Sequence, residues 1–171
     1  MARTAGPIYH GATRNRQGGD MERSRDIWPE TDDQETIRAW VQRNWRTTLM
    51  NSLDIRLVEI APGRAVGELP VRDGVRAPIG AVHAGAIVAL ADTIATGAAL
   101  AAINRPGQPE RFPLAIDLSV QLVGNVDDGR LRAESEVVHR GRTLVVVHTR
   151  VSSAETGRLV ALVTSTHFVP A

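Results

Sequence analysis

The sequence predicts an α+β domain in which an antiparallel β-sheet curls around one long α-helix. Two observations favour this fold class. A nearly uninterrupted apolar helix over 83–103 is followed by four strand-like segments in succession, and the turns between those segments are too short for the crossover helices of a parallel sheet. The length of 171 residues fits a single domain of this kind.

The N-terminal part is expected to hold a flexible leader over 1–30 and the first helix of a single domain over 31–171. The leader contains five Arg and four Asp or Glu without apolar periodicity, which is typical of a segment that cannot build a core. The polar run 31–33 supplies N-cap side chains for an amphipathic helix that ends near Asn51. Its apolar residues recur at helical spacing, and we interpret the two tryptophans among them as packing anchors rather than ligand-stacking groups: Ile37, Trp40, Val41 and Trp45.

The next segments alternate as strands do. Residues 52–61 and 64–71 are separated by Pro62-Gly63, a turn signal, and therefore predict a β-hairpin. A polar connector over 72–78 leads to the long helix over 83–103. The remaining strands are expected over 112–123, 131–139, 143–153 and 158–169.

The long helix is apolar nearly all round, which fits a helix that a sheet wraps on most sides. Its many alanines and Gly97 are expected to let the sheet approach closely. The stretch 79–103 is long enough to span a bilayer, but Asp92 lies near its middle, where an acid costs about 2.5–3.5 kcal/mol on insertion scales. We therefore expect a core helix and, because no apolar signal segment precedes it, a cytoplasmic protein.

The composition excludes several classes of chemistry. The chain has no Cys and no Lys, all 20 basic residues being Arg, so disulfides, thiolate metal ligands, a cysteine nucleophile and Schiff-base catalysis are excluded. A formal charge of +1 gives no argument for nucleic acid binding. No two His, or His and carboxylate, stand at the spacing of a helical metal site, so no metal is expected.

Asp92 is the first candidate functional residue, because it lies about two and a half turns inside the apolar helix. An acid there is costly unless it is paired or hydrogen-bonded. It is therefore either held by hydroxyls such as those of Thr93 and Thr96, or it is a carboxylate in a pocket wall that acts as base or nucleophile.

The start of the same helix is the second candidate. Residues 80–85 read Gly-Ala-Val-His-Ala-Gly, and free N–H groups at a helix N-terminus can hold an oxyanion. Ala84 and Asp92 are eight residues apart, about 12 Å along a helix, whereas both must lie close to one carbonyl carbon to act together. If both act, two antiparallel copies of the helix form the site, which predicts an obligate homodimer.

The segment 80–85, followed by Ala89-Leu90-Ala91-Asp92-Thr93, resembles two motifs of hotdog-fold thioesterases of the PaaI (4-hydroxybenzoyl-CoA thioesterase-like) type. These are the helix-start motif, usually written H-G-G, and the motif of the catalytic acid, usually written L-A-D. The nine-residue interval from His83 to Asp92 matches that of the family. Downstream, 115–120, 129–131 and 140–143 resemble the last strands and turns. The resemblance covers roughly residues 79–169.

The resemblance implies a hotdog fold and hydrolysis of an acyl-CoA thioester. By this analogy Asp92 attacks the thioester carbonyl or activates a water molecule. The backbone N–H of Ala84 from the partner chain, together with that of Gly85, polarises the carbonyl oxygen, and His83 supports the helix start and the substrate. No cofactor is implied, because coenzyme A is part of the substrate.

The resemblance also implies contacts at the substrate and an assembly. Thr93, Thr96 and Ala115 are expected near the acyl group, and the turn Arg140-Gly141-Arg142 near the CoA phosphates, where guanidinium pairing is favourable. The expected partner is a second copy of the chain, in a homodimer or a homotetramer made of dimers, with no nucleic acid and no membrane.

Departures from the family pattern keep two other interpretations open. Ala77 and Ala115 stand where many members carry Asn and Ser or Thr, and Ala84 replaces the first Gly of H-G-G. A hotdog protein that binds an acyl thioester without hydrolysing it is therefore the second interpretation. The third is a dehydratase or hydratase that uses His83 beside a carboxylate, but His83 and Asp92 lie about 180° apart on one helix.

Overall fold

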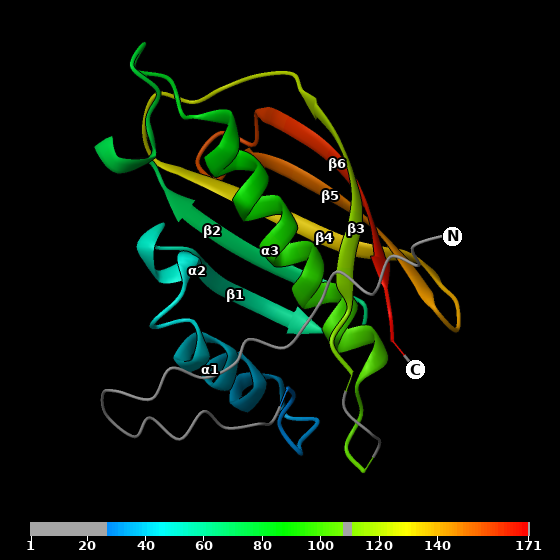
Figure 1. Ribbon diagram of the computed structural model, residues 1–171. Helices are drawn as coiled ribbons and strands as arrows, with labels where there is room; N and C mark the ends of the chain where they lie inside the picture. The colour runs from blue at the N-terminus through cyan, green and yellow to red at the C-terminus, as the bar shows by residue number, and fades with distance from the viewer. Residues whose placement is uncertain (1–26, 108–110, 171) are drawn as a thin grey trace, which may run out of the picture.

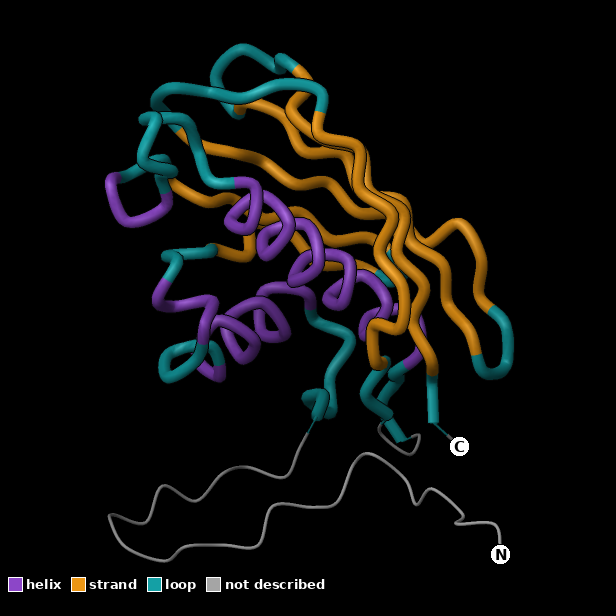
Figure 2. Tube along the Cα trace, turned by 45° about the horizontal axis from the view of Figure 1, so that its top comes forward, coloured by secondary structure: helices purple, strands orange, loops and turns teal. Residues whose placement is uncertain are grey.

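The computed structural model describes residues 27–107 and 111–170, and within them six strands form one antiparallel sheet in the order β1-β2-β4-β5-β6-β3. Helix α3 (Ala84–Ile103) lies across the concave face of this sheet (Figure 1). Figure 2 shows how the strands curl around the helix. The predicted hotdog arrangement is therefore confirmed. The strands are β1 (Arg56–Ala61), β2 (Arg64–Pro70), β3 (Leu114–Leu122), β4 (Arg130–Arg140), β5 (Leu144–Ser153) and β6 (Leu159–Phe168).

Helix α3 forms the centre of the core. Leu90, Ile94 and Ala98 are fully buried between the helix and the sheet, where they meet inward-facing strand residues such as Leu131 and Val147. In length and composition α3 is the one described helix that could also cross a membrane. Its packing inside the sheet is that of a core helix, as expected from Asp92.

The sheet approaches α3 closely at Gly67 on β2. A Cβ atom at this position would overlap the Cδ1 atom of Ile94, which no real side chain tolerates. The sequence pointed instead to Gly97, but a Cβ atom there would lie 3.6 Å from the Cβ atom of Ala65, an ordinary contact. The residue that permits close packing therefore lies on the strand and not on the helix.

We expect Gly67→Ala to lower the free energy of unfolding by about 1–3 kcal/mol, because the added methyl group must displace Ile94 in a packed core. Urea unfolding measures this. Gly97→Ala is the matched control: it adds the same methyl group where there is room, and Ala is favoured over Gly inside a helix by about 1 kcal/mol. Equal stabilities of the two variants would contradict this account of the packing.

The predicted first helix is two helices. Helix α1 (Gln34–Asn44) begins at the N-cap Asp33, whose side chain accepts a hydrogen bond from the Thr36 N–H, and α2 (Leu49–Ser52) follows it. The prediction of one helix to Asn51 is wrong, because α1 ends at Asn44 and Thr48 closes a turn between the two helices. Its N–H and its hydroxyl both donate to the Trp45 carbonyl, at 3.0 and 2.6 Å, and Thr has a low helix propensity.

The folded part begins earlier than the expected boundary at residue 31. Trp28 is 5% exposed and belongs to the main hydrophobic core. Most of the expected leader, residues 1–26, lies outside the described residues. The segment just before α1 is thus part of the domain.

The two edges of the sheet differ. At β1, Gln42 of α1 takes the place of a neighbouring strand: its Oε1 atom accepts from the Leu57 N–H at 2.9 Å and its Nε2 atom donates to the Ile55 carbonyl. At β3, no described strand or helix pairs with the outer side. The inward-facing Leu118 and Leu122 of this strand are 38% and 47% exposed, so β3 presents an open, apolar edge.

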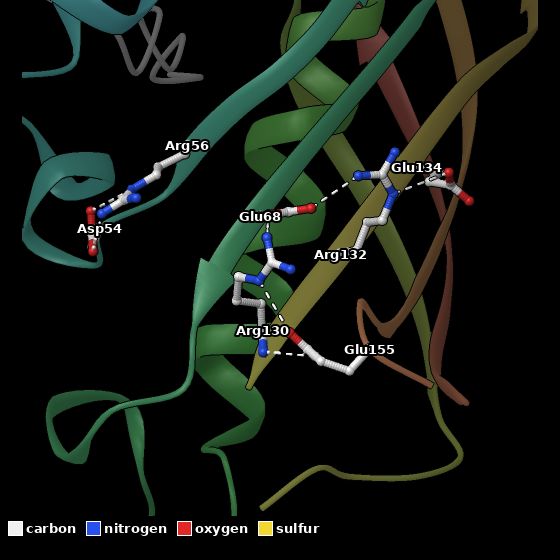
Figure 3. A network of polar contacts seen from close by, with 7 residues as sticks. All are labelled: Asp54, Arg56, Glu68, Arg130, Arg132, Glu134 and Glu155. Carbon is white, nitrogen blue, oxygen red and sulfur yellow. Dashed lines mark hydrogen bonds and ion pairs between the residues drawn. The ribbon is translucent and has the colours of Figure 1, made fainter. Parts of the chain in front are cut away.

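A network of ion pairs fixes the beginning of β4 (Figure 3). The carboxylate of Glu68, whose side chain is 14% exposed, accepts from Arg130 at 2.6 Å and from Arg132 at 3.0 Å. Arg130 also pairs with Glu155 of the β5–β6 turn at 3.1 Å. Three separate segments are thereby joined where the β3–β4 loop meets the sheet.

Candidate active site

Asp92 lies on the side of α3 that the sheet leaves uncovered. Its Oδ1 atom is buried and has no hydrogen-bond partner among the described residues. Burial raises the pKa of this carboxyl above its ordinary value of 3.8. Neither the Thr93 nor the Thr96 hydroxyl bonds to the carboxylate. The expectation of a buried acid held by these hydroxyls is therefore wrong. An unpaired, partly desolvated carboxylate is suited to act as a base or nucleophile.

A cavity of about 310 Å³ opens beside this carboxylate. The predicted residues Thr93, Thr96 and Ala115 all line it together with Asp92, so the structure brings these four together. None of the other lining residues has a charged or hydrogen-bonding side chain apart from the indole N–H groups of the two tryptophans. These residues are Trp28, Val41, Trp45, Met50, Leu57, Ile60, Gly97, Leu100, Phe112, Pro113 and Leu114. The carboxylate therefore faces an almost wholly apolar space.

One wall of the cavity comes from the N-terminal segment. Trp28, Val41, Trp45 and Met50 contribute it, and none of them was predicted as a site residue. Both Trp40 and Trp45 pack against the core, as the interpretation of packing anchors requires. Trp45 also lines the cavity, which that interpretation did not foresee. Helical periodicity predicts which residues face inward, but not which of them border a void.

The start of α3 offers a free backbone donor. His83 is the N-cap, and its Nδ1 atom accepts from the Gly85 N–H at 2.9 Å. The Ala84 N–H, one residue earlier, has no partner among the described residues, and Ala84 is exposed. The donor available to an oxyanion is therefore Ala84, whereas the Gly85 N–H is already engaged.

The position of this helix start is set by two residues that sequence reasoning missed. The side chain of Asn125 pairs with the backbone of Val82 as a strand would: it accepts from the Val82 N–H and donates to the Val82 carbonyl, both at 3.0 Å. Arg76 donates to the carbonyls of Gly80 and Asp127. An Asn in a loop carries no distinctive pattern, so only the tertiary structure shows this role.

A single chain does not bring the two catalytic candidates together. Ala84 and Asp92 stand on one continuous helix, about 12 Å apart along its axis. His83, Ala84 and Gly85 are exposed and do not line the cavity. One chain therefore does not place the Ala84 N–H and the Asp92 carboxylate beside the same point.

The turn Arg140-Gly141-Arg142 is exposed at one end of the sheet. Leu144, just after it, pairs in register with Phe168, and Phe168 pairs with Leu114 at the beginning of β3. The turn therefore lies at the same end of the sheet as Leu114 and Ala115, which border the cavity. It does not itself line the cavity.

Comparisons with known proteins identify the family of the chain. A family model described as "Thioesterase superfamily" matches residues 79–160. "Putative esterase ComA2" of Bacillus subtilis (strain 168) is 34% identical over 104 residues, which cover 61% of this chain and 80% of that protein. The 1,4-dihydroxy-2-naphthoyl-CoA hydrolase of Listeria monocytogenes is 25% identical over 114 residues, or 67% of this chain and 89% of that protein. Among solved structures, a mutant of the phenylacetic acid degradation protein PaaI from Thermus thermophilus matches with a TM-score of 0.62 and 28% identity, covering 70% of this chain and 96% of that one.

Proposed function

Because the chain belongs to the thioesterase superfamily and is a thioester hydrolase, we propose that it hydrolyses an acyl-CoA to a free acid and CoA. The observation that carries this proposal is the unpaired carboxylate of Asp92 in the wall of an apolar cavity. An apolar cavity can accommodate an acyl chain, which would bring the thioester carbonyl beside the carboxylate. The match to a CoA thioester hydrolase of Listeria monocytogenes supports CoA as the leaving group.

In the proposed reaction Asp92 acts either as the nucleophile or as a general base. It either adds to the thioester carbonyl carbon directly, giving an acyl-enzyme anhydride that water cleaves, or removes a proton from a water molecule that adds instead. In both cases the C–S bond breaks and the CoA thiolate takes up a proton. Burial favours this role, because a carboxylate with a raised pKa is a stronger base.

The negative charge that develops on the carbonyl oxygen needs a donor, and we assign this to the free N–H of Ala84 of the partner subunit. The 12 Å or so between Ala84 and Asp92 on one helix exclude the same chain's Ala84. Two antiparallel α3 helices would place each Ala84 beside the other copy's Asp92, giving two equivalent sites in a homodimer. The open β3 edge supports this assembly, because two such edges can pair into one sheet.

The turn Arg140-Gly141-Arg142 is proposed to bind the CoA phosphates. Both guanidinium groups are exposed in a turn at the sheet end that borders the cavity, and they form no ion pair among the described residues. Guanidinium groups bind phosphate oxygens in a bidentate way. No cofactor takes part in this scheme.

The proposed function is tested by thiol release from a panel of acyl-CoAs, detected with a thiol-reactive dye. The protein contains no Cys and adds no background signal. Release of CoA with wild-type protein is the expected result. A folded dimer that releases no thiol from any acyl-CoA but binds one would favour the non-hydrolysing hotdog protein, and hydration of an enoyl-CoA would favour the hydratase.

We expect sedimentation at micromolar concentration to show a dimer. Leu118→Arg should dissociate it, because this inward-facing residue of the β3 edge is 38% exposed in the single chain and would place a charge in the interface. Leu162→Arg, at a leucine of β6 that is 43% exposed, is the matched control and should leave the dimer intact. An active wild-type monomer would contradict the shared site.

A further inference from the structure

The lining of the cavity beside Asp92 comes from several parts of the chain. Helix α3 and residues 112–115 lie inside the stretch 79–160 that the family model matches. Residues 28–50 and β1 lie outside that stretch. The residue proposed to supply the chemistry therefore belongs to the matched stretch, whereas part of the pocket lining does not.

The N-terminal wall is held firmly in place. Gln42 bonds twice to the β1 edge, at Ile55 and Leu57. The hydroxyl of Thr48 donates to the Trp45 carbonyl and lies 3.6 Å from the Met50 sulfur. These contacts fix the turn between α1 and α2, so its side chains form a boundary rather than a loose cover.

The size of the cavity limits what it can hold. Its volume is about 310 Å³. An engineered apolar cavity of about 150 Å³ admits benzene, so about twice that volume accommodates roughly twelve carbon atoms. Apart from Asp92 the lining contains only two polar side chains, the hydroxyls of Thr93 and Thr96, and no cation that would pair with a charged acyl group.

We propose that Trp28, Trp45 and Met50 form one wall of the acyl pocket and that the pocket sets an upper limit of about twelve carbons on an uncharged acyl group. This inference rests on the proposed function, because it takes the acyl group of the thioester as the occupant. The wall side chains do not touch the thioester itself. They are specificity-determining residues, and shortening one of them extends the pocket without changing the carboxylate.

The first test compares kcat/KM for a series of straight-chain acyl-CoAs from butanoyl to octadecanoyl. Wild type should prefer chains up to dodecanoyl. Trp45→Ala and Met50→Ala should raise the ratio of hexadecanoyl-CoA to dodecanoyl-CoA activity by about tenfold or more, since each methylene that a pocket admits or rejects changes specificity by that order.

Trp40→Ala is the matched control for this test. It removes the same kind of side chain from α1, just before Trp45 in the chain, where the indole packs against the core without lining the cavity. Its chain-length profile should remain that of wild type. An unchanged profile in Trp45→Ala and Met50→Ala, with wild-type circular dichroism, would overturn the proposal while leaving acyl-CoA hydrolysis in place.

The second test does not require hydrolysis. The protein has three tryptophans, of which Trp28 and Trp45 line the cavity and Trp40 does not. Dodecan-1-ol, an uncharged twelve-carbon probe, should change the tryptophan emission of wild type and of Trp40→Phe in a saturable way, and the change should be smaller in Trp45→Phe. A response that depends on Trp40, or no saturable response, would overturn the pocket assignment. Absence of thiol release alone would instead contradict the proposed function.

Discussion

Asp92→Asn is expected to lower kcat for acyl-CoA hydrolysis by at least about 10²-fold, because the amide can neither attack the carbonyl nor accept a proton from water. The substitution preserves the shape of the side chain, so KM should change little. Thiol release under saturating substrate measures the effect. Asp128→Asn, in an exposed turn, is the control for loss of one negative charge.

The same substitution is expected to make the protein more stable near neutral pH. Burial raises the pKa of Asp92 in the folded chain above the 3.8 of the unfolded chain, so the unfolded state loses its proton more readily. The ionised carboxyl therefore destabilises the fold as the pH rises above 3.8. Asn removes this cost, so Tm should rise at neutral pH but not at a pH well below 3.8, where Asp92 is protonated in both states.

The combination distinguishes a functional acid from a structural one. Replacing an acid that held the fold together would lower both activity and Tm. Replacing Asp92 should lower activity but raise Tm. Retention of full activity in Asp92→Asn would exclude the carboxylate from the reaction.

Ala84→Pro is expected to lower kcat by about 10²- to 10³-fold, because proline has no N–H to donate to the developing oxyanion. The substitution suits the backbone. Ala84 is the first residue of α3, a position where proline is favoured, and His83 before it has a ψ of 132°, as a residue preceding proline requires. Thermal unfolding should therefore be unchanged.

Ala84→Gly serves as the control at the same position, because it keeps the N–H and removes only the methyl group. Its kcat should stay near that of wild type. If Ala84→Pro were as active as Ala84→Gly, the oxyanion donor would have to lie elsewhere.

The long helix and the last four strands could be predicted because their signals are local. Apolar residues fill 83–103, and the alternating runs after it are separated by Gly-containing turns. Asp92 could be singled out by the same reasoning, because an acid in an apolar helix needs an explanation. The structure places Thr93, Thr96 and Ala115 around the same cavity.

The rest depends on contacts between residues far apart in the chain. Trp28 and Met50 border the cavity only because α1 packs beside β1, and Asn125 reaches Val82 across 43 positions. The end of α1 at Asn44 could not be predicted either, since the hydroxyl bond from Thr48 to the Trp45 carbonyl competes with helix propagation in a way that apolar periodicity does not reveal.

The two bonds between Gln42 and the β1 backbone also bear on how copies of this chain could add to one another. A sheet with two free edges can grow without limit, as fibrils do. Among the described residues, Gln42 occupies backbone groups of Ile55 and Leu57 at the β1 edge, whereas no described strand pairs with the outer side of β3. We therefore expect strand addition at β3 to be favoured over addition at β1, which would make a closed pair favoured over a growing chain of copies.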